Sequence, residues 1–393
     1  MMNMRYKGYI HAFLAAAVIC LASACIKNDI DYGTSDREVS ISPVTSISAK
    51  SIPGAIVGNR YPFDETMGIM AFHSQAAPGA WSEDDVKEAA ENDPHIDKGE
   101  FGYIPKHGAW GGIRTTLVDG KRKSVEHHPY LWPEDGSLIF AGFSPYYKFE
   151  AVNVDNLTKE GKLKEIKDKV SFDVATRTLR VDDYTVGQYI PMSADQIIDP
   201  EYEYVNTSQS DAMFFMPQVV DGHYVGVNKL SSYPARFYHA LSLVEFKVRA
   251  EDDYDMDRIH IDRITLDQVY HTGDFSATVN DDGSISGQWT SLKGQKDIHI
   301  FGDEGGHDGS EELVMDMELR SVAQLMIIPG PTHAITVGCH VYTMGKYYNQ
   351  TFIIDPEDVG IENWEMGKRY VYNLIIGLNK IEFSPETYEW NDN

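Results

Sequence analysis

The last thirty residues of the chain alternate between apolar and polar side chains in three short stretches. In the first stretch, one face of an extended chain carries the apolar side chains Tyr370, Tyr372, Leu374 and Ile376. Ile381 and Phe383 alternate with charged residues in the second, and Tyr388 and Trp390 alternate with polar residues after a serine–proline pair in the third. A period of two predicts half-buried strands. An aromatic-rich chain end of this kind is suited to pairing with a sheet edge, either its own or that of a neighbouring molecule.

The rest of the chain also consists of short apolar runs, which are divided by Gly, Pro and Asp. One series of runs lies between residues 67 and 215, and a second begins near Tyr233. This pattern predicts antiparallel β-sandwiches rather than alternating strands and helices. The exception is the segment 81–91, where Ser82 stands as an N-cap and a short helix is predicted. The polar stretch 219–232 is the predicted boundary between two domains.

The first strand is predicted close to the start of the chain. Val39, Ile41 and Ile47 share one parity, and serines fill most of the other. Pro43 argues for an edge strand rather than a central one. The loop that follows contains Lys50, a basic residue that we expect to be exposed.

Residues 1–24 have the features of an export signal. A positive start is followed by an apolar segment that is too short to span a bilayer, and small residues precede Cys25. The run 21–25 resembles a bacterial lipobox, which predicts that Cys25 becomes the lipid-modified first residue of the mature protein, for example with palmitate. An ordinary secretory cleavage near Ala24 is the alternative. The polar residues up to Arg37 predict a flexible tether.

Composition narrows the function classes. The chain has 60 acidic against 34 basic residues and a formal charge of −26, which opposes binding to a phosphate backbone, so we expect no nucleic-acid partner. Of its three cysteines, Cys20 leaves with the leader and Cys25 would carry lipid. Cys339 then has no partner for an internal disulfide, and its apolar surroundings in sequence predict a buried, inert thiol.

Candidate chemistry is sparse. The sequence has no nucleophile elbow, zinc-protease helix motif, phosphate loop or paired-cysteine spacing, so we expect no enzyme, no cofactor and no metal site. His127 and His128 are adjacent and would point to opposite faces of a strand. The acidic segment 303–312 does not have the spacing of a calcium loop, and a solvated loop is the preferred interpretation. Tyrosines that could stack on sugars leave a glycan-binding protein as an alternative function; they include Tyr146, Tyr147, Tyr202 and Tyr204.

Several of these segments, in the same order, resemble the fimbrillin-like proteins, which are the subunits of type V pili. They are residues 61–72, 130–145, 237–248, 325–329, 367–374, 378–385 and the terminal Trp390. The resemblance implies two transthyretin-like antiparallel β-sandwich domains in tandem. With it we expect a signal peptide at 1–24, a lipidated tether and removable first strand at 25–50, and domains at 51–225 and 226–393.

The resemblance also implies a mechanism of assembly. A trypsin-like protease, which cuts after Arg or Lys, would remove the tether and the first strand from an exported lipoprotein precursor at the outer membrane. Lys50 is the expected cleavage residue, with Arg37 and Arg60 as alternatives. The strand with Val39, Ile41 and Ile47 would leave a groove, and another pilus subunit would fill it with a C-terminal donor strand carrying Ile381, Phe383, Tyr388 and Trp390. An uncleaved anchor subunit of the pilus that keeps its lipid is the alternative role.

Overall fold

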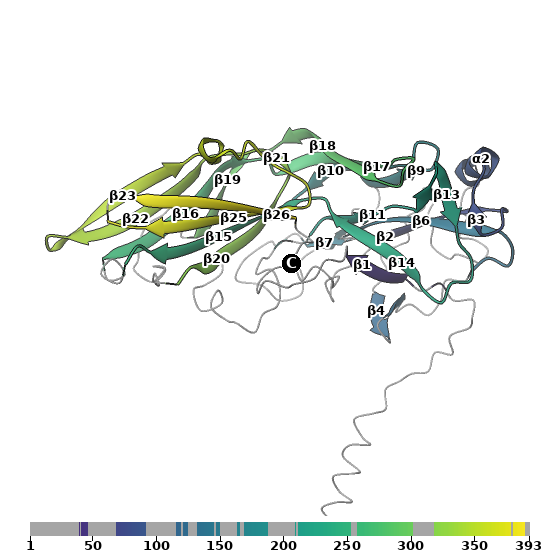
Figure 1. The fold of residues 1–393 in the computed structure, drawn as a ribbon, viewed down its shortest axis with the longest axis horizontal. Coiled ribbons are helices and arrows are strands. Elements are labelled where there is room, and N and C mark those ends of the chain that lie inside the picture. Colours follow the sequence, from purple (N-terminus) through teal and green to yellow (C-terminus); the bar gives the residue numbers. More distant parts are fainter. Residues whose placement is uncertain are drawn as a thin grey trace, which may run out of the picture. The chain divides into compact units, whose positions relative to one another are not determined.

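The computed structural model describes residues 39, 41–45, 68–91, 115–118, 121–124, 132–144, 147–149, 163–165, 169–187, 209, 211–252, 258–301, 318–378 and 380–389. Nearly all of its elements are β-strands, which confirms the predicted all-β class (Figure 1). The predicted helix is also confirmed as α2 (Glu83–Glu91). The Ser82 hydroxyl accepts a hydrogen bond from the Asp85 backbone N–H, and Asp85 in turn accepts from the Ser82 backbone N–H at 2.7 Å. This reciprocal capping box explains why the helix starts there.

A seven-stranded sheet contains the first strand. Its order is β2 (Gly68–Ser74), β6 (Ser137–Ser144), β11 (Met213–Phe215), β14 (Tyr233–His239), β1 (Ile41–Thr45), β5 (Lys121–Ser124) and β4 (Thr115–Val118). Every residue of β6 is buried, because alternate side chains enter two different apolar clusters on the two faces of the sheet. Burial on both faces accounts for a strand sequence that is a nearly continuous apolar run.

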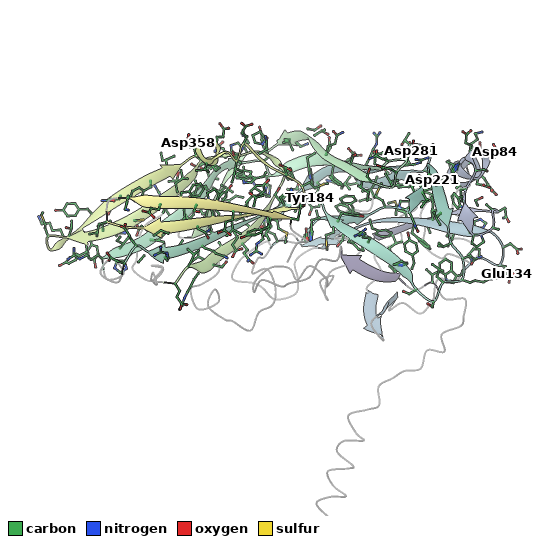
Figure 2. All side chains as sticks on the ribbon, in the orientation of Figure 1. Asp84, Glu134, Tyr184, Asp221, Asp281 and Asp358 are labelled. Atoms are coloured by element: carbon green, nitrogen blue, oxygen red, sulfur yellow. The ribbon has the colours of Figure 1, made fainter. Side chains whose placement is uncertain are left out.

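A four-stranded sheet covers one face of this seven-stranded sheet. Its order is β18 (Ile285–Lys293), β17 (Thr272–Val279), β10 (Thr178–Thr185) and β9 (Val170–Asp173). The apolar cluster between the two sheets, here called the inner cluster, includes Tyr184 (Figure 2), whose ring contacts those of Phe143 and Trp289. Since β14, β17 and β18 follow residue 226 in sequence, strands from both sides of the predicted domain boundary build these sheets. The boundary itself stays a prediction.

The C-terminal part of the chain forms a sandwich of two four-stranded sheets. One has the order β20 (Arg320–Ile327), β15 (Ser242–Ala250), β25 (Lys368–Ile376) and β26 (Ile381–Glu389). The other has the order β19 (Lys296–Phe301), β16 (Ile259–Val269), β22 (Ile335–Thr343) and β23 (Lys346–Ile354). Their facing side chains form one core, which contains the predicted apolar face of β25. Most pairings are antiparallel as predicted, but β15 pairs with β25 in parallel, and β1 with β14 likewise.

Short elements complete the described structure. A three-stranded sheet joins β12 (Val219–Val220), β13 (His223–Gly226) and β3 (Gly79–Ala80), and two-stranded sheets join β7 (Tyr147–Phe149) with β8 (Leu163–Glu165) and β21 (Gly330–Pro331) with β24 (Asn363–Trp364). A single 3₁₀ turn, η4 (Pro356–Val359), lies among the described residues after β23.

Three expectations need correction. The run 237–248 is divided between two sheets, because β14 ends at His239 and β15 starts at Ser242. The C-terminal stretches form two strands rather than three, since β26 continues through Ser384 and Pro385. Finally, β1 is not an edge strand, because it pairs with β14 on one side and with β5 on the other. Its pairing with β5 is confined to Ile41, which precedes the proline.

Candidate functional site

The first strand is held in the sheet along its whole length. All five residues of β1 pair in parallel with β14, from Ile41 opposite Tyr233 to Thr45 opposite Phe237, and the two strands lie side by side in Figure 1. Val39, just before the strand, is 6% exposed, and Ile41 is 3% exposed. Two of the three residues assigned to the removable strand therefore have buried side chains. The third, Ile47, lies outside the described residues.

Val39 and Ile41 belong to an apolar cluster on the face of the seven-stranded sheet that points away from β9 and β10. We call it the outer cluster; it contains Val39, Ile41, Ile69, Ala71, Trp132, Leu138, Phe140, Met213, Phe215, Tyr233, Ala235 and Phe237. Aromatic rings dominate it, and the ring of Phe140 lies 4.6 Å from that of Tyr233. Neither Val39 nor Ile41, the residues of this segment whose side chains the structure describes, belongs to the inner cluster, whose first described member is Met70. Loss of Val39 and Ile41 would therefore remove no side chain from the inner cluster.

The strand that receives β1 was not singled out from the sequence. Tyr233, Ala235 and Phe237 alternate with exposed or half-buried residues along β14, and all three are buried in the outer cluster. That period of two is visible in the sequence and could have marked a strand there. The parallel pairing with a segment almost two hundred residues away carries no local signal.

The predicted donor segment forms the edge strand of its own sheet. All nine residues of β26 pair antiparallel with β25, with Ile381 opposite Ile376 and Phe383 opposite Leu374. Ile381 and Phe383 pack against the core of the C-terminal sandwich, and the Phe383 ring lies 5.3 Å from that of Tyr372. Pro385 is compatible with this position, because a proline cannot donate a ladder hydrogen bond and is found in edge strands.

Because β26 is continuous, its apolar residues are divided between two faces. Tyr388 has the opposite parity to Ile381 and Phe383, so it lies on the face away from the sandwich core. There its hydroxyl donates a hydrogen bond to the Glu386 carboxylate, which raises the pKa of Tyr388. Glu386 also accepts a hydrogen bond from the Asn373 side chain at 3.0 Å. Trp390 lies outside the described residues.

A buried ion pair lies on the same face of the sheet, between β15 and β25. The Arg369 guanidinium donates two hydrogen bonds to one oxygen of Glu245, the one from Nε at 3.0 Å. Both residues are at most 1% exposed. Removal of either partner would leave a buried charge without compensation, so the pair fixes β25 against β15, next to β26.

Ion pairs also tie the two ends of β26. The Lys380 ammonium lies 2.6 Å from a Glu251 carboxylate oxygen and 2.8 Å from one of Glu382, and these contacts raise the pKa of Lys380. Lys368 bonds to Glu389 at the other end. Exposed pairs of this kind contribute little stability, so the strand is held mainly by its backbone ladder and by Ile381 and Phe383.

The other candidate residues from the sequence lie away from β1 and β26 or outside the described residues. Cys339 is fully buried in the core of the C-terminal sandwich, and burial raises the pKa of its thiol to about 12, in line with the predicted inert cysteine. No described group of His, Cys, Asp and Glu is arranged to hold a metal ion. Among the described residues, no helix combines the length and apolarity needed to cross a bilayer. The remaining candidates lie outside the described residues or their described side chains: Cys25, Arg37, Lys50, Arg60, His127, His128, segment 303–312, and the four tyrosines 146, 147, 202 and 204.

Comparison with known proteins identifies the family. The model of a family described as fimbrillin-like matches residues 111–390, which is most of the chain. The chain belongs to the fimbrillin-like family. This confirms the resemblance found in the sequence. Membership supports a structural role as a subunit of a cell-surface fimbria, in contact with other subunits, rather than a catalytic role.

Solved structures of several bacterial proteins are similar to this fimbrillin-like protein. A fimbrial protein of Bacteroides vulgatus is 15% identical, with a TM-score of 0.47 and coverage of 90% of this chain and 99% of that one. A protein of Bacteroides uniformis, described as a candidate cell adhesion protein, is 13% identical, with a TM-score of 0.45 and coverage of 91% and 100%. The tip fimbrial protein Mfa3 of Porphyromonas gingivalis is 8% identical, with a TM-score of 0.31 and coverage of 90% and 99%. No curated protein matches the sequence significantly.

Proposed function

We propose that this fimbrillin-like protein is exported as a lipoprotein precursor and polymerises into a pilus by donor-strand exchange. Lipid on Cys25 anchors the precursor in the outer membrane. A protease specific for Arg or Lys cuts after Lys50, or alternatively after Arg37 or Arg60. A cut after Lys50 or Arg60 releases the strand with Val39, Ile41 and Ile47, and the C-terminal segment of another subunit takes its place beside β14. A cut after Arg37, which precedes that strand, would release only the tether.

The observation that carries this proposal is the place of Val39 and Ile41. They are the only described contribution of the first 67 residues to an apolar cluster, and they fill the outer cluster beside β14 without taking part in the inner cluster. Removal of this strand uncovers the edge of β14 that carries Tyr233, Ala235 and Phe237, and it takes neither Val39 nor Ile41 from the inner cluster. Burial of an apolar side chain contributes about 1.5–3 kcal/mol, so the exposed strand edge is a strong site for a replacement strand.

The donor segment has the properties that this edge requires. Ile381 and Phe383 have the same spacing as Val39 and Ile41, two residues apart on one face. Tyr388 and Trp390 have the opposite parity, so beside β14 they would lie on the other face of the sheet, next to the exposed Pro234 and Arg236 and the half-buried Tyr238. In the precursor the same segment is docked on its own sheet as β26, so exchange would trade its nine-residue ladder with β25 for pairing with β14, where β1 pairs over five residues.

Electron microscopy of the purified precursor before and after limited trypsin treatment tests the proposal. We expect single particles before treatment and filaments after it, with Ser51 as the new N-terminus in sheared material. A Lys50→Ala variant whose treated chains begin at Glu38 or at Tyr61 assigns the cut to Arg37 or to Arg60, respectively. Trypsin-treated protein that loses the first strand and stays monomeric at high concentration contradicts strand exchange.

A shaft subunit and an anchor subunit differ in whether the chain in the pilus keeps its lipidated N-terminus. Mass spectrometry of sheared pili that finds chains beginning at Ser51 identifies a shaft subunit. Chains that begin at an acylated Cys25 identify an uncleaved anchor.

A further inference from the structure

Exposed apolar side chains gather on one hairpin of the C-terminal sandwich. Eight large apolar residues are exposed among the described ones, and five of them lie on β22, β23 or the turn between them: Tyr342, Met344, Tyr347, Tyr348 and Ile353. Because these side chains are exposed, core packing does not account for them. A contiguous exposed apolar patch commonly marks a binding site.

Two tyrosines of this hairpin form a pair on its outer face. Tyr342 lies directly opposite Tyr347, their ring centroids are 4.9 Å apart, and they are 39% and 59% exposed. We call this pair the tyrosine platform. Its neighbours Val341 and Cys339 in β22 have the opposite parity and enter the sandwich core, so the platform points away from the core.

The hairpin holds the platform in a defined geometry. The turn contains only Met344 and Gly345, with φ values of 50° and 77°, as in a type I′ turn. A two-residue turn of this type fixes the register of the strands and therefore places the two rings opposite one another. The platform is thus preorganised, which lowers the entropic cost of binding a ligand.

Polar side chains lie next to the platform on the same face. In the two ladders, His340 of β22 is paired with His260 of β16 on one side and with Asn349 of β23 on the other. This row lies two residues along the strands from Tyr342 and Tyr347. The rings of His260 and His340 lie 6.1 Å and 6.4 Å from that of Tyr347. His340 is oriented by a hydrogen bond with Asp262.

We propose that this face binds a neutral glycan, with a sugar ring stacked on the tyrosine platform and its hydroxyl groups bonded to the row of His260, His340 and Asn349. Aromatic rings offer an apolar face to the C–H groups of a sugar, and imidazole and amide groups both donate and accept hydrogen bonds, as hydroxyl groups require. The chain carries a formal charge of −26, which disfavours acidic sugars and selects neutral ones.

The exposed area of the tyrosine platform suits a sugar ring better than a protein partner. With exposed fractions of 39% and 59%, the two tyrosines offer about 200 Å² of surface together. A stable protein interface buries about 800 Å² on each partner. One or two sugar rings fit the platform, whereas a protein partner would need far more surface than it offers.

A glycan array followed by titration with saturation-transfer NMR tests the proposal on the full mature chain. The array contains neutral oligosaccharides of hexoses and N-acetylhexosamines together with sialylated and sulfated ones. We expect binding to a neutral member by the monomer, and a loss of affinity of about tenfold in Tyr347→Ala. Tyr347→Trp, which keeps a stacking surface, should retain binding.

Tyr348→Ala is the matched control. Tyr348 is also exposed, at 47%, and adjoins Tyr347 on the same strand, but its parity places it off the outer face. This variant should bind within about twofold of the parent, and the melting temperatures of all variants should agree. Absence of glycan binding, a preference for acidic glycans, or an equal loss in Tyr347→Ala and Tyr348→Ala overturns the proposal. A shift of self-association by Tyr347→Ala without sugar binding assigns the patch to contact between copies of the chain instead.

Discussion

Ile41 lies opposite Tyr233 where β1 pairs in parallel with β14, and both side chains are buried in the outer cluster. The pair joins a segment near the start of the chain to one beyond its middle. The outer cluster is separate from the inner cluster, so this contact can be lost without loss of the main packing between the sheets. The proposed strand exchange requires that this contact can be lost independently.

Truncation of Ile41 should loosen the first strand. Ile41→Ala removes buried methyl groups from the outer cluster, and such changes cost about 2–5 kcal/mol. We expect faster cleavage by trypsin at the basic residues that flank the first strand. Backbone amides of β14 should exchange hydrogen faster, and those of β16 and β22 should change little. The matched control is Ile353→Ala, because Ile353 is 74% exposed on β23. Equal protease resistance in the two variants would show that the outer cluster does not hold the first strand.

Truncation of Phe383 should block assembly more than folding. Phe383 is only partly buried against the core of the C-terminal sandwich, where its ring contacts Tyr372. We expect Phe383→Ala to lower the free energy of unfolding by about 1–3 kcal/mol and to abolish or shorten filaments after trypsin treatment. Thr387→Ala, an exposed position of the same strand, should assemble normally. Filaments of ordinary length from Phe383→Ala would remove this residue from the donor set.

The ion pair of Glu245 and Arg369 should show strong coupling. Glu245→Leu or Arg369→Met alone leaves one buried charge, which costs about 3–5 kcal/mol. The double variant removes both charges and should lose less stability than the sum of the two single losses. Urea unfolding of the four proteins measures the coupling, and additive losses would mean that the two charges do not compensate one another.

The buried thiol gives a prediction at alkaline pH. Burial raises the pKa of Cys339 from an ordinary value of 9.0 to about 12, so the folded state holds the thiol proton more tightly than the unfolded state does. The resulting stability is complete below pH 9.0 and is lost as the pH rises towards 12. Iodoacetamide at pH 8.5 should leave the native thiol unmodified and label it after unfolding. Cys339→Ala should weaken the alkaline loss of stability, whereas labelling of the native protein at the rate of a free thiol would contradict the burial.

Several strands and the helix could be predicted from the local order of apolar and polar residues. The alternation in β25 and β26, the run in β6 and the capping box at Ser82 each depend on neighbours within a few residues, and the corresponding elements are present. The break of the run 237–248 was not predictable in this way, because apolar residues continue through Ala240 and Leu241 while the strand leaves one sheet for another. The continuity of β26 through Pro385 depends on the strand being at a sheet edge, which is a property of the assembled sheet.

The proposed binding surfaces show the same division. The sequence indicated Ile381 and Phe383 as apolar positions of a terminal strand, since the alternation of apolar and polar residues is visible locally. It did not indicate Tyr233 as the partner of Ile41, because strand pairing over almost two hundred residues is decided by how whole sheets pack. Nor did it separate Tyr342 and Tyr347 from the other tyrosines, because exposure depends on the neighbouring strands.

The sequence by itself determined the all-β class, several of the segments that form strands, and the family to which the chain belongs. It did so because side-chain alternation and turn residues act over a few positions. Only the tertiary structure decided which strands are neighbours, that β6 is buried on both faces of its sheet, and which aromatic rings remain exposed. Those features arise from contacts between residues far apart in the chain, whose free energy depends on the packing of complete layers.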